Sequence, residues 1–242
     1  MSEAKKSDRL ETQAELKQKA AERAVDLVQS SMVLGLGTGS TTRFALEYIG
    51  LRIKTGQLRD IVGIPSSLQT EKIAKELGIP LTSFDEHQEI YLTIDGADEV
   101  DLHLNLIKGG GGALLREKIL AQSSRRNIII VDEHKLSPKL GTHCPLPVEV
   151  IPFAIKPVAN YITSLGAKVI LRKKNDGSTY TTDQNNFILD CNFGPISNPE
   201  ELALKLSNRA GIVEHGLFLG LATEVIVATE NGIRHIMREK QF

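Results

Sequence analysis

Two aspartates, a lysine, a run of glycines and a glutamate follow one another between Asp95 and Glu117 of this chain. Asp95 and Asp98 come first, and the run Lys108-Gly109-Gly110-Gly111-Gly112 follows them. Carboxylates can move protons, and a lysine can stabilise a developing negative charge. Consecutive glycines cannot hold a helix or a strand, but they let backbone N–H groups approach a ligand oxygen closely. The combination predicts acid–base chemistry on a bound ligand.

Glu117 is the candidate general base of this group. The helix predicted after the glycines turns by about 100° per residue, which places Glu117 on an apolar arc. That arc is made by Ala113, Leu114, Leu120 and Ala121. Loss of water raises the pKa of a carboxyl group toward neutrality, as a general base requires. The alternative is an exposed glutamate in a helix rich in Glu and Lys. The glycines and aspartates upstream favour the role of general base over this alternative.

A second glycine-rich loop, Gly35-Leu36-Gly37-Thr38-Gly39-Ser40-Thr41, lies between a predicted strand and a predicted helix. This is the usual context of a phosphate-binding loop. Ser40 stands where the dinucleotide-binding fingerprint has its third glycine, and the lysine of a P-loop is missing. Backbone N–H groups and the hydroxyls of Thr38, Ser40 and Thr41 favour a terminal phosphate monoester. A tight turn with a purely structural role is the alternative.

No metal site is predicted. The spacing of Asp95, Asp98 and the acids that follow them matches no calcium-binding loop, and no His or Cys stands close to them in sequence. Lys135 follows a predicted strand, and it either contacts an anionic substrate or is merely solvated. Because the histidines show no ligand spacing, surface or structural roles are expected for His87, His103, His134, His143, His215 and His235.

Alternating strands and helices in the first part of the chain must position these residues. Short apolar runs predict strands over residues 31–37, 61–64, 91–94 and 127–132. Capping residues and helical spacing predict helices from Thr12 to about Val28, from Thr41 to about Gly50, and over 67–77. This order predicts an α/β fold with a mostly parallel, Rossmann-like sheet covered on both faces. Ligands of such sheets bind at the carboxyl ends of the strands, where Asp95 and Asp98 lie.

The order of predicted strands and helices changes after Gly141. Strands are predicted over 146–150, 168–172, 187–191 and 212–215, and helices over 155–165 and 198–209. The order βαββαβ is that of a ferredoxin-like α+β unit. Since residues 224–228 and 232–237 look like further strands of the first sheet, the smaller domain is expected as an insertion. The predicted boundaries are 142–218 for the insert, and 1–141 with 219–242 for the Rossmann-like catalytic domain.

The composition is that of an ordinary globular protein. The chain has 242 residues, 41% hydrophobic and 24% charged, and its formal net charge is −1. A net charge so close to zero predicts neither nucleic acid nor an acidic membrane as a partner. The N-terminal residues lack the apolar segment of a secretory signal or an anchor. With only two cysteines, far apart, a reduced cytoplasmic protein is expected.

In this order and spacing, four motifs resemble the A-type ribose-5-phosphate isomerases. They are Gly37-Thr38-Gly39-Ser40-Thr41, Asp95-Gly96-Ala97-Asp98-Glu99, Lys108-Gly109-Gly110-Gly111 and Arg116-Glu117-Lys118. Pro145-Leu146-Pro147-Val148-Glu149-Val150 and Gly216-Leu217-Phe218 also look like that family. Each motif is weak alone, whereas the ordered set is specific. The resemblance runs from about Glu15 to about Ile236.

The resemblance implies an aldose–ketose isomerase that interconverts D-ribose 5-phosphate and D-ribulose 5-phosphate through a cis-enediolate, without a cofactor. It implies Glu117 as the base, Lys108 as a stabiliser of the enediolate, and Asp95 and Asp98 as groups that handle hydroxyl protons. A homodimer or higher homo-oligomer, working in the pentose phosphate pathway or the Calvin cycle, is also implied. The implied substrate-binding residues are Thr38, Gly39, Ser40, Thr41, Asp95, Gly96, Ala97, Asp98, Lys108, Gly109, Gly110, Gly111 and Lys135.

Two rival classes share this kind of scaffold. A sugar-phosphate-sensing module of a transcription regulator would need a helix-turn-helix, and the chain before Met32 has room for only one helix. A CoA-transferase-like enzyme would use the glutamate as a nucleophile, and no site for an adenine nucleotide is evident in the sequence.

Overall fold

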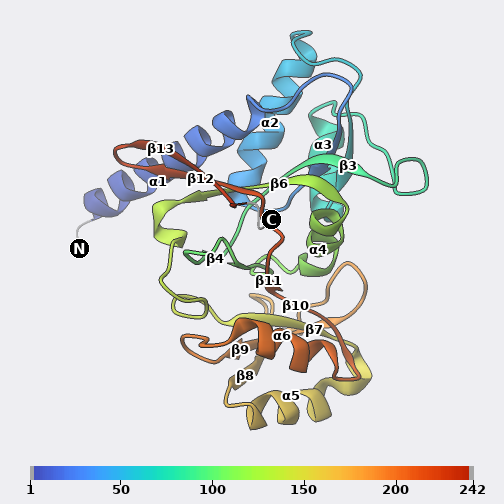
Figure 1. Ribbon diagram of the computed structural model, residues 1–242, viewed down its shortest axis with the longest axis vertical. Helices are drawn as coiled ribbons and strands as arrows, with labels where there is room; N and C mark the ends of the chain where they lie inside the picture. The colour runs from blue at the N-terminus through green and yellow to red at the C-terminus, as the bar shows by residue number, and fades with distance from the viewer. Residues whose placement is uncertain (1–2, 240–242) are drawn as a thin grey trace. The chain divides into compact units, whose positions relative to one another are not determined.

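The computed structural model describes residues 3–239 (Figure 1). The chain divides into two compact units. The first is formed by the chain up to Gly96, by Leu120–Lys135 and by the chain from Ala222 on, and the second by Ala97–Ile119 and Leu136–Leu221. The predicted domain boundaries near residues 142 and 218 stay a prediction.

The first unit contains a six-stranded sheet in the order β13-β12-β6-β3-β1-β2. All neighbouring strands pair in parallel except β12 and β13, which are antiparallel. The mostly parallel sheet is therefore confirmed. Its strands are β1 (Val33–Leu36), β2 (Val62–Pro65), β3 (Ile90–Asp95), β6 (Ser124–Asp132), β12 (Glu224–Thr229) and β13 (Gly232–Met237).

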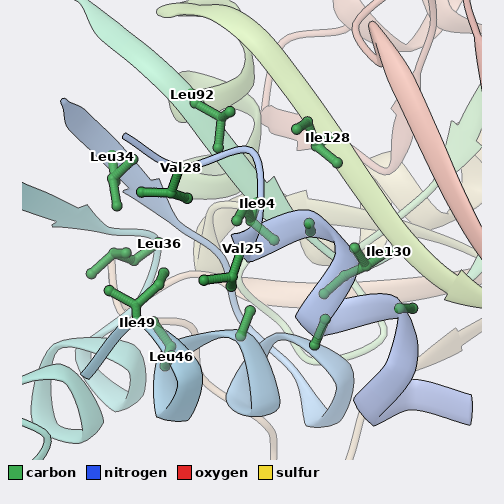
Figure 2. Close-up of a cluster of buried hydrophobic side chains, with 14 of the residues drawn as sticks. Val25, Val28, Leu34, Leu36, Leu46, Ile49, Leu92, Ile94, Ile128 and Ile130 are labelled. Atoms are coloured by element: carbon green, nitrogen blue, oxygen red, sulfur yellow. The ribbon is translucent and has the colours of Figure 1, made fainter. Parts of the chain in front are cut away.

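Helices α1 (Glu3–Val25), α2 (Ser40–Lys54) and α3 (Leu68–Glu76) supply the core on one face of this sheet. Figure 2 shows Val25 of α1 and Leu46 and Ile49 of α2 against the strands. The strand residues that they meet are Leu34, Leu36, Leu92, Ile94, Ile128 and Ile130. Alternation along a strand is what places Leu34 with Leu36, and Leu92 with Ile94, on the same side.

The end of α4 (Leu114–Gln122) covers the opposite side of β1. A Cβ built at Gly35 would lie 3.0 Å from Leu120 Cδ2, so the glycine leaves room for this leucine. Leu120 packs there with Ile64 and Ile90. A sheet covered on both faces was the expectation, and this packing agrees with it.

Two predicted helix ends are wrong. The helix α1 begins at Glu3, well before Thr12, so the helix does not start at the predicted cap. The helix α2 runs through Gly50 to Lys54. A Cβ at Gly50 would lie 2.9 Å from the Leu77 carbonyl oxygen, which shows that this glycine permits close packing and does not end the helix.

The second unit contains a four-stranded antiparallel sheet in the order β10-β7-β9-β8. With its two α-helices it follows the predicted order βαββαβ along the chain. Both helices contribute to the same apolar cluster as the sheet, through Val158, Ile162, Leu202 and Leu206. The elements are β7 (Leu146–Val150), α5 (Ile155–Ser164), β8 (Lys168–Leu171), β9 (Phe187–Asn192), α6 (Pro199–Ser207) and β10 (Ile212–His215).

A small antiparallel sheet of the second unit was not predicted. It joins β4 (Glu99–Val100), β5 (Leu106–Ile107) and β11 (Leu217–Phe218) in the order β11-β5-β4. Strands of two residues are too short to show an alternating pattern, so periodicity cannot detect them. This sheet matters because Lys108 directly follows β5.

No helix among residues 3–239 combines the length and the apolar character needed to cross a bilayer.

Candidate active site

The glycine-rich loop of the first unit connects β1 to the N-terminus of α2. A Cβ at Gly37 would lie 2.3 Å from Asp95 Oδ1 and 2.6 Å from the Ile94 carbonyl oxygen, so only glycine fits there. Gly39 is the N-cap of α2 with φ 130°, a conformation that favours glycine. The first turn of α2 carries no acidic residue. The loop therefore leads into a helix N-terminus whose N–H groups and dipole favour an anion.

The hydroxyl of Thr38 lies in a cluster of four hydroxyls. It is 2.7 Å from Ser66 Oγ, 2.8 Å from Ser67 Oγ and 2.9 Å from Thr70 Oγ1. Thr70 Oγ1 also donates to the Gly37 carbonyl oxygen at 3.0 Å. The cluster fastens the loop to the start of α3, where Ser67 caps the helix by accepting from the Thr70 N–H at 3.0 Å.

A cavity of about 370 Å³ opens beside this loop. Ser40 is exposed at its wall and accepts a hydrogen bond from Lys17 Nζ at 3.1 Å. Arg43, which forms an ion pair with Glu47 at 3.0 Å, is a basic residue of the lining. A hollow with a helix N-terminus, hydroxyls and basic side chains has the chemistry of a phosphate site. Its lining residues are Gly37, Thr38, Gly39, Ser40, Arg43, Leu46, Gln69, Thr70 and Ile73.

Asp95 ends β3 and is buried, with 2% of its surface exposed. Its Oδ1 accepts from the Thr38 N–H at 3.2 Å and from the Gly96 N–H at 2.8 Å. These two hydrogen bonds fix the carboxylate against the loop. The structure thus brings Asp95 together with the predicted loop residues inside the first unit.

Lys135 lies at the same sheet edge as Asp95. It belongs to the short 3-10 helix η1 (Glu133–Lys135) that follows β6, and β6 is parallel to β3. Its side chain is half-buried. A contact of Lys135 with substrate stays a prediction.

Within the second unit, Asp98 holds the glycine run. Its Oδ2 accepts from the Gly110 N–H at 2.7 Å. A Cβ at Gly110 would lie 2.6 Å from Asp98 Oδ1, so the carboxylate approaches the backbone too closely for a side chain. Asp98 therefore positions the backbone after Lys108. This is in addition to its predicted role in proton transfer.

Lys108 and Glu117 form a buried ion pair. Lys108 Nζ lies 3.2 Å from Glu117 Oε1, and the two side chains are 4% and 6% exposed. The Phe218 ring lies 5.7 Å from the same ammonium group. Burial of Glu117 agrees with the expected apolar arc, while the lysine partner was not predicted. A carboxylate base beside a cation, both out of bulk water, is an arrangement for proton abstraction that generates an anion.

A second, partly buried ion pair lies one residue along α4. Lys118 Nζ is 2.6 Å from Glu214 Oε1, 2.6 Å from the His215 carbonyl oxygen and 4.9 Å from the centre of the Phe218 ring. Burial lowers the pKa of Lys118, and Glu214 opposes that shift. Burial, and then the Lys118 charge, lower the pKa of His215 from 6.5 to about 4. His215 is therefore neutral near pH 7 at a buried position.

His215 makes the stability of the fold depend on pH. Because its pKa falls from 6.5 in the unfolded chain to about 4 in the folded one, the unfolded chain binds the extra proton between these values. The contribution of His215 to the free energy of unfolding is complete above about pH 6.5 and disappears as the pH falls toward 4. We expect urea unfolding to show a loss of about 2 kcal/mol from this group between about pH 7 and pH 5.

The His215→Gln variant should show a smaller decrease in stability over this pH range. His103→Gln, at an exposed position of the same unit, is the control and should keep the wild-type slope. If the free energy of unfolding of His215→Gln depends on pH as in the wild type, His215 is not the group responsible.

Within residues 3–239, no group of three or more His, Cys, Asp or Glu side chains could hold a metal ion.

The side chains that hold the two glycine loops were not predicted from the sequence. Ser66, Ser67 and Thr70 had a weak signal, because they follow the predicted strand β2 at the sheet edge where β1 also ends. Arg172 and Tyr180, which contact the glycine run after Lys108, had no signal in the sequence, since long-range contacts leave no periodic pattern.

The fold and these groups define an α/β enzyme with acid–base residues at glycine-rich loops. The profile of the family Ribose 5-phosphate isomerase A (phosphoriboisomerase A) matches residues 62–232. The ribose-5-phosphate isomerase A of Desulfatibacillum aliphaticivorans is 56% identical over 225 residues, which cover 93% of this chain and 98% of the relative. The chain belongs to the ribose-5-phosphate isomerase A family.

Solved structures agree with this membership. The ribose 5-phosphate isomerase of Plasmodium falciparum has a TM-score of 0.91 and 40% identity, covering 94% of this chain and 100% of its own. A D-ribose-5-phosphate isomerase in complex with phospho-erythronic acid also has a TM-score of 0.91 and 40% identity, with 93% and 98% covered. Of the three classes that the sequence left open, membership selects the isomerase over the sensing module and the CoA transferase.

Proposed function

We propose that this chain interconverts D-ribose 5-phosphate and D-ribulose 5-phosphate, with Glu117 as the general base. The observation that carries the mechanism is the buried pair of Lys108 and Glu117, 3.2 Å apart, next to the glycine run. The reaction needs the open-chain sugar and the removal of a proton from the carbon next to its carbonyl group. A single base can take the proton from C2 and return it to C1.

The pair suits this chemistry because one negative charge lies next to Lys108 both before and after proton transfer. Before proton transfer the ammonium group faces the Glu117 carboxylate. When Glu117 takes the proton it becomes neutral, and the negative charge moves to an oxygen of the cis-enediolate. Lys108 then stabilises the enediolate in place of the carboxylate, with little reorganisation in a buried environment. The amide groups of the glycine run would add hydrogen bonds to the same oxygen.

Asp95 and Asp98 would handle the hydroxyl protons in ring opening and between O1 and O2. Each is oriented by a backbone N–H, that of Thr38 for Asp95 and that of Gly110 for Asp98. Fixed carboxylates can exchange protons with a hydroxyl group at a defined position.

The substrate phosphate would bind at the N-terminus of α2. The loop N–H groups, Ser40 and Thr41 would contact it, with Lys135 as a further cationic contact. A phosphorylated sugar acid of the kind bound in the relative's structure, phospho-erythronic acid, should bind this chain as an inhibitor. The proposal also includes a cytoplasmic homodimer or higher homo-oligomer, serving the pentose phosphate pathway or the Calvin cycle.

A coupled assay of ribose 5-phosphate conversion tests the proposal. Activity should survive exhaustive treatment with EDTA, because a lysine ammonium supplies the positive charge at the enediolate. Activity that is lost in EDTA and restored by one divalent ion would overturn the metal-free mechanism. Absence of conversion by the untreated protein would overturn the function itself.

A further inference from the structure

Side chains outside the family motifs hold the carbonyl groups of the glycine run. Arg172 Nη1 donates to the Gly109 carbonyl oxygen at 2.8 Å and to the Gly110 carbonyl oxygen at 3.1 Å. The Tyr180 hydroxyl donates to the Gly111 carbonyl oxygen at 3.1 Å. Three consecutive carbonyls are thus fixed by two residues of the segment between β8 and β9.

The two donors are themselves fixed. Arg172 Nε donates to Asp190 Oδ2 at 2.9 Å, and Nη2 bonds the other oxygen, so the guanidinium group grips the carboxylate on β9 with two hydrogen bonds. The Tyr180 N–H donates to the Arg172 carbonyl oxygen at 3.0 Å. The Tyr180 ring centre lies 5.7 Å from the guanidinium carbon. The clamp, defined as Arg172, Tyr180 and Asp190, is therefore a connected set of side chains that is anchored on β9.

Fixing these carbonyls also fixes the amide groups that follow them. The peptide bond is planar and trans, so each C=O and the next N–H point in opposite directions. The Gly110 N–H is directed at Asp98, and the Gly112 N–H closes a turn on the Gly109 carbonyl oxygen at 3.0 Å. The Gly111 N–H lies between them at an exposed position and has no hydrogen-bond partner within residues 3–239.

The clamp approaches the run so closely that it dictates a glycine. A Cβ at Gly112 would lie 2.1 Å from the Tyr180 hydroxyl oxygen, and φ there is +85°. No side chain fits under the tyrosine without moving it.

We infer that Arg172 and Tyr180 are positioning residues that aim the Gly111 N–H at the negatively charged oxygen of the bound intermediate. This rests on the proposed isomerase function. The guanidinium charge also polarises the peptide groups that it contacts, and chains of hydrogen bonds strengthen one another. Since Asp190 balances that charge, the clamp adds a directed donor to the site with no net charge of its own.

The test compares Arg172→Met and Tyr180→Phe with the wild type in steady-state kinetics. Losing two charged hydrogen bonds should lower kcat by on the order of 10²-fold in Arg172→Met, and losing one neutral hydrogen bond should lower it by roughly 3- to 10-fold in Tyr180→Phe. KM for ribose 5-phosphate should change by less than about threefold, because the phosphate loop is untouched. Affinity for phospho-erythronic acid should fall in step with kcat, because its carboxylate carries a negative charge like that of the enediolate.

Guanidinium rescue separates positioning from folding. Millimolar guanidinium chloride should restore part of kcat in Arg172→Ala, and Arg172→Lys should stay impaired because lysine cannot bind Asp190 and both carbonyls together. Lys173→Met is the matched control, since its ammonium contacts the Thr179 hydroxyl at 3.0 Å, and its kcat should equal that of the wild type.

A kcat within about twofold of the wild type in folded Arg172→Met and Tyr180→Phe would overturn the inference. Equal losses in Lys173→Met would overturn it too. If Arg172→Met does not fold, Tyr180→Phe and Arg172→Lys decide. A wild-type protein without isomerase activity would instead refute the function from which the inference starts.

Discussion

Replacement of Glu117 by glutamine should lower kcat for ribose 5-phosphate by on the order of 10²–10⁴-fold, the usual contribution of a positioned general base. Glutamine keeps the size of the side chain and an oxygen for the Lys108 ammonium group at 3.2 Å, so the packing around this pair should survive. The base itself is lost. Binding of a sugar phosphate should change far less, since the loop before α2 is unaltered.

Hydrogen exchange gives this prediction a second readout. In D₂O the wild type should exchange part of the C2 hydrogen of ribose 5-phosphate with solvent, and Glu117→Gln should not. Glu201→Gln, an exposed position of α6, is the control and should behave like the wild type. Near-normal turnover or exchange in Glu117→Gln would remove Glu117 from the mechanism and leave Asp95 or Asp98 as the base.

The strands and helices that carry the candidate groups could be predicted because they depend on local patterns. The alternation of strands and helices indicated a mostly parallel sheet, and the period of α4 indicated that Glu117 is buried. What Glu117 meets there could not be predicted. Lys108 reaches it from the end of β5, a strand of two residues that shows no periodicity.

The supports of the two glycine loops could not be predicted for the same reason. A contact of Thr38 with the substrate stays a prediction, whereas its hydroxyl partners near α3 were not predicted. Arg172 directly follows β8 and binds Asp190 of the neighbouring antiparallel strand β9, whose register partner is Ile170. Such contacts follow from the register of a sheet, which short strands with mixed burial specify weakly in the sequence.

The buried pair also explains why a mutation of its lysine would be hard to interpret. Removing one partner of a buried ion pair leaves an uncompensated charge and typically costs about 3–5 kcal/mol. A Lys108 variant would therefore lose stability as well as activity. Glu117→Gln also removes one charge of the pair but keeps an oxygen for the Lys108 ammonium group, so its free energy of unfolding should be measured together with its activity. Truncation of the substrate leaves the protein unchanged.

The second large effect concerns the phosphate group of the substrate. Free ribose should have a kcat/KM lower by on the order of 10³-fold or more than ribose 5-phosphate, because three hydrogen bonds to a charged group contribute about 1.5 kcal/mol each at least. The observation behind this is the N-terminus of α2, which follows a glycine-rich loop and has no acidic residue in its first turn.

The double variant Ser40→Ala, Thr41→Ala should act in the same direction and raise KM for ribose 5-phosphate about tenfold or more, since it removes two hydroxyl donors. Thr55→Ala is the matched control, because its hydroxyl donates to the Leu51 carbonyl oxygen at the opposite end of α2. It should leave KM unchanged. The double variant should discriminate less between ribose and ribose 5-phosphate than the wild type does. Comparable kcat/KM values for the two sugars with the wild type would show that the loop before α2 does not bind the phosphate.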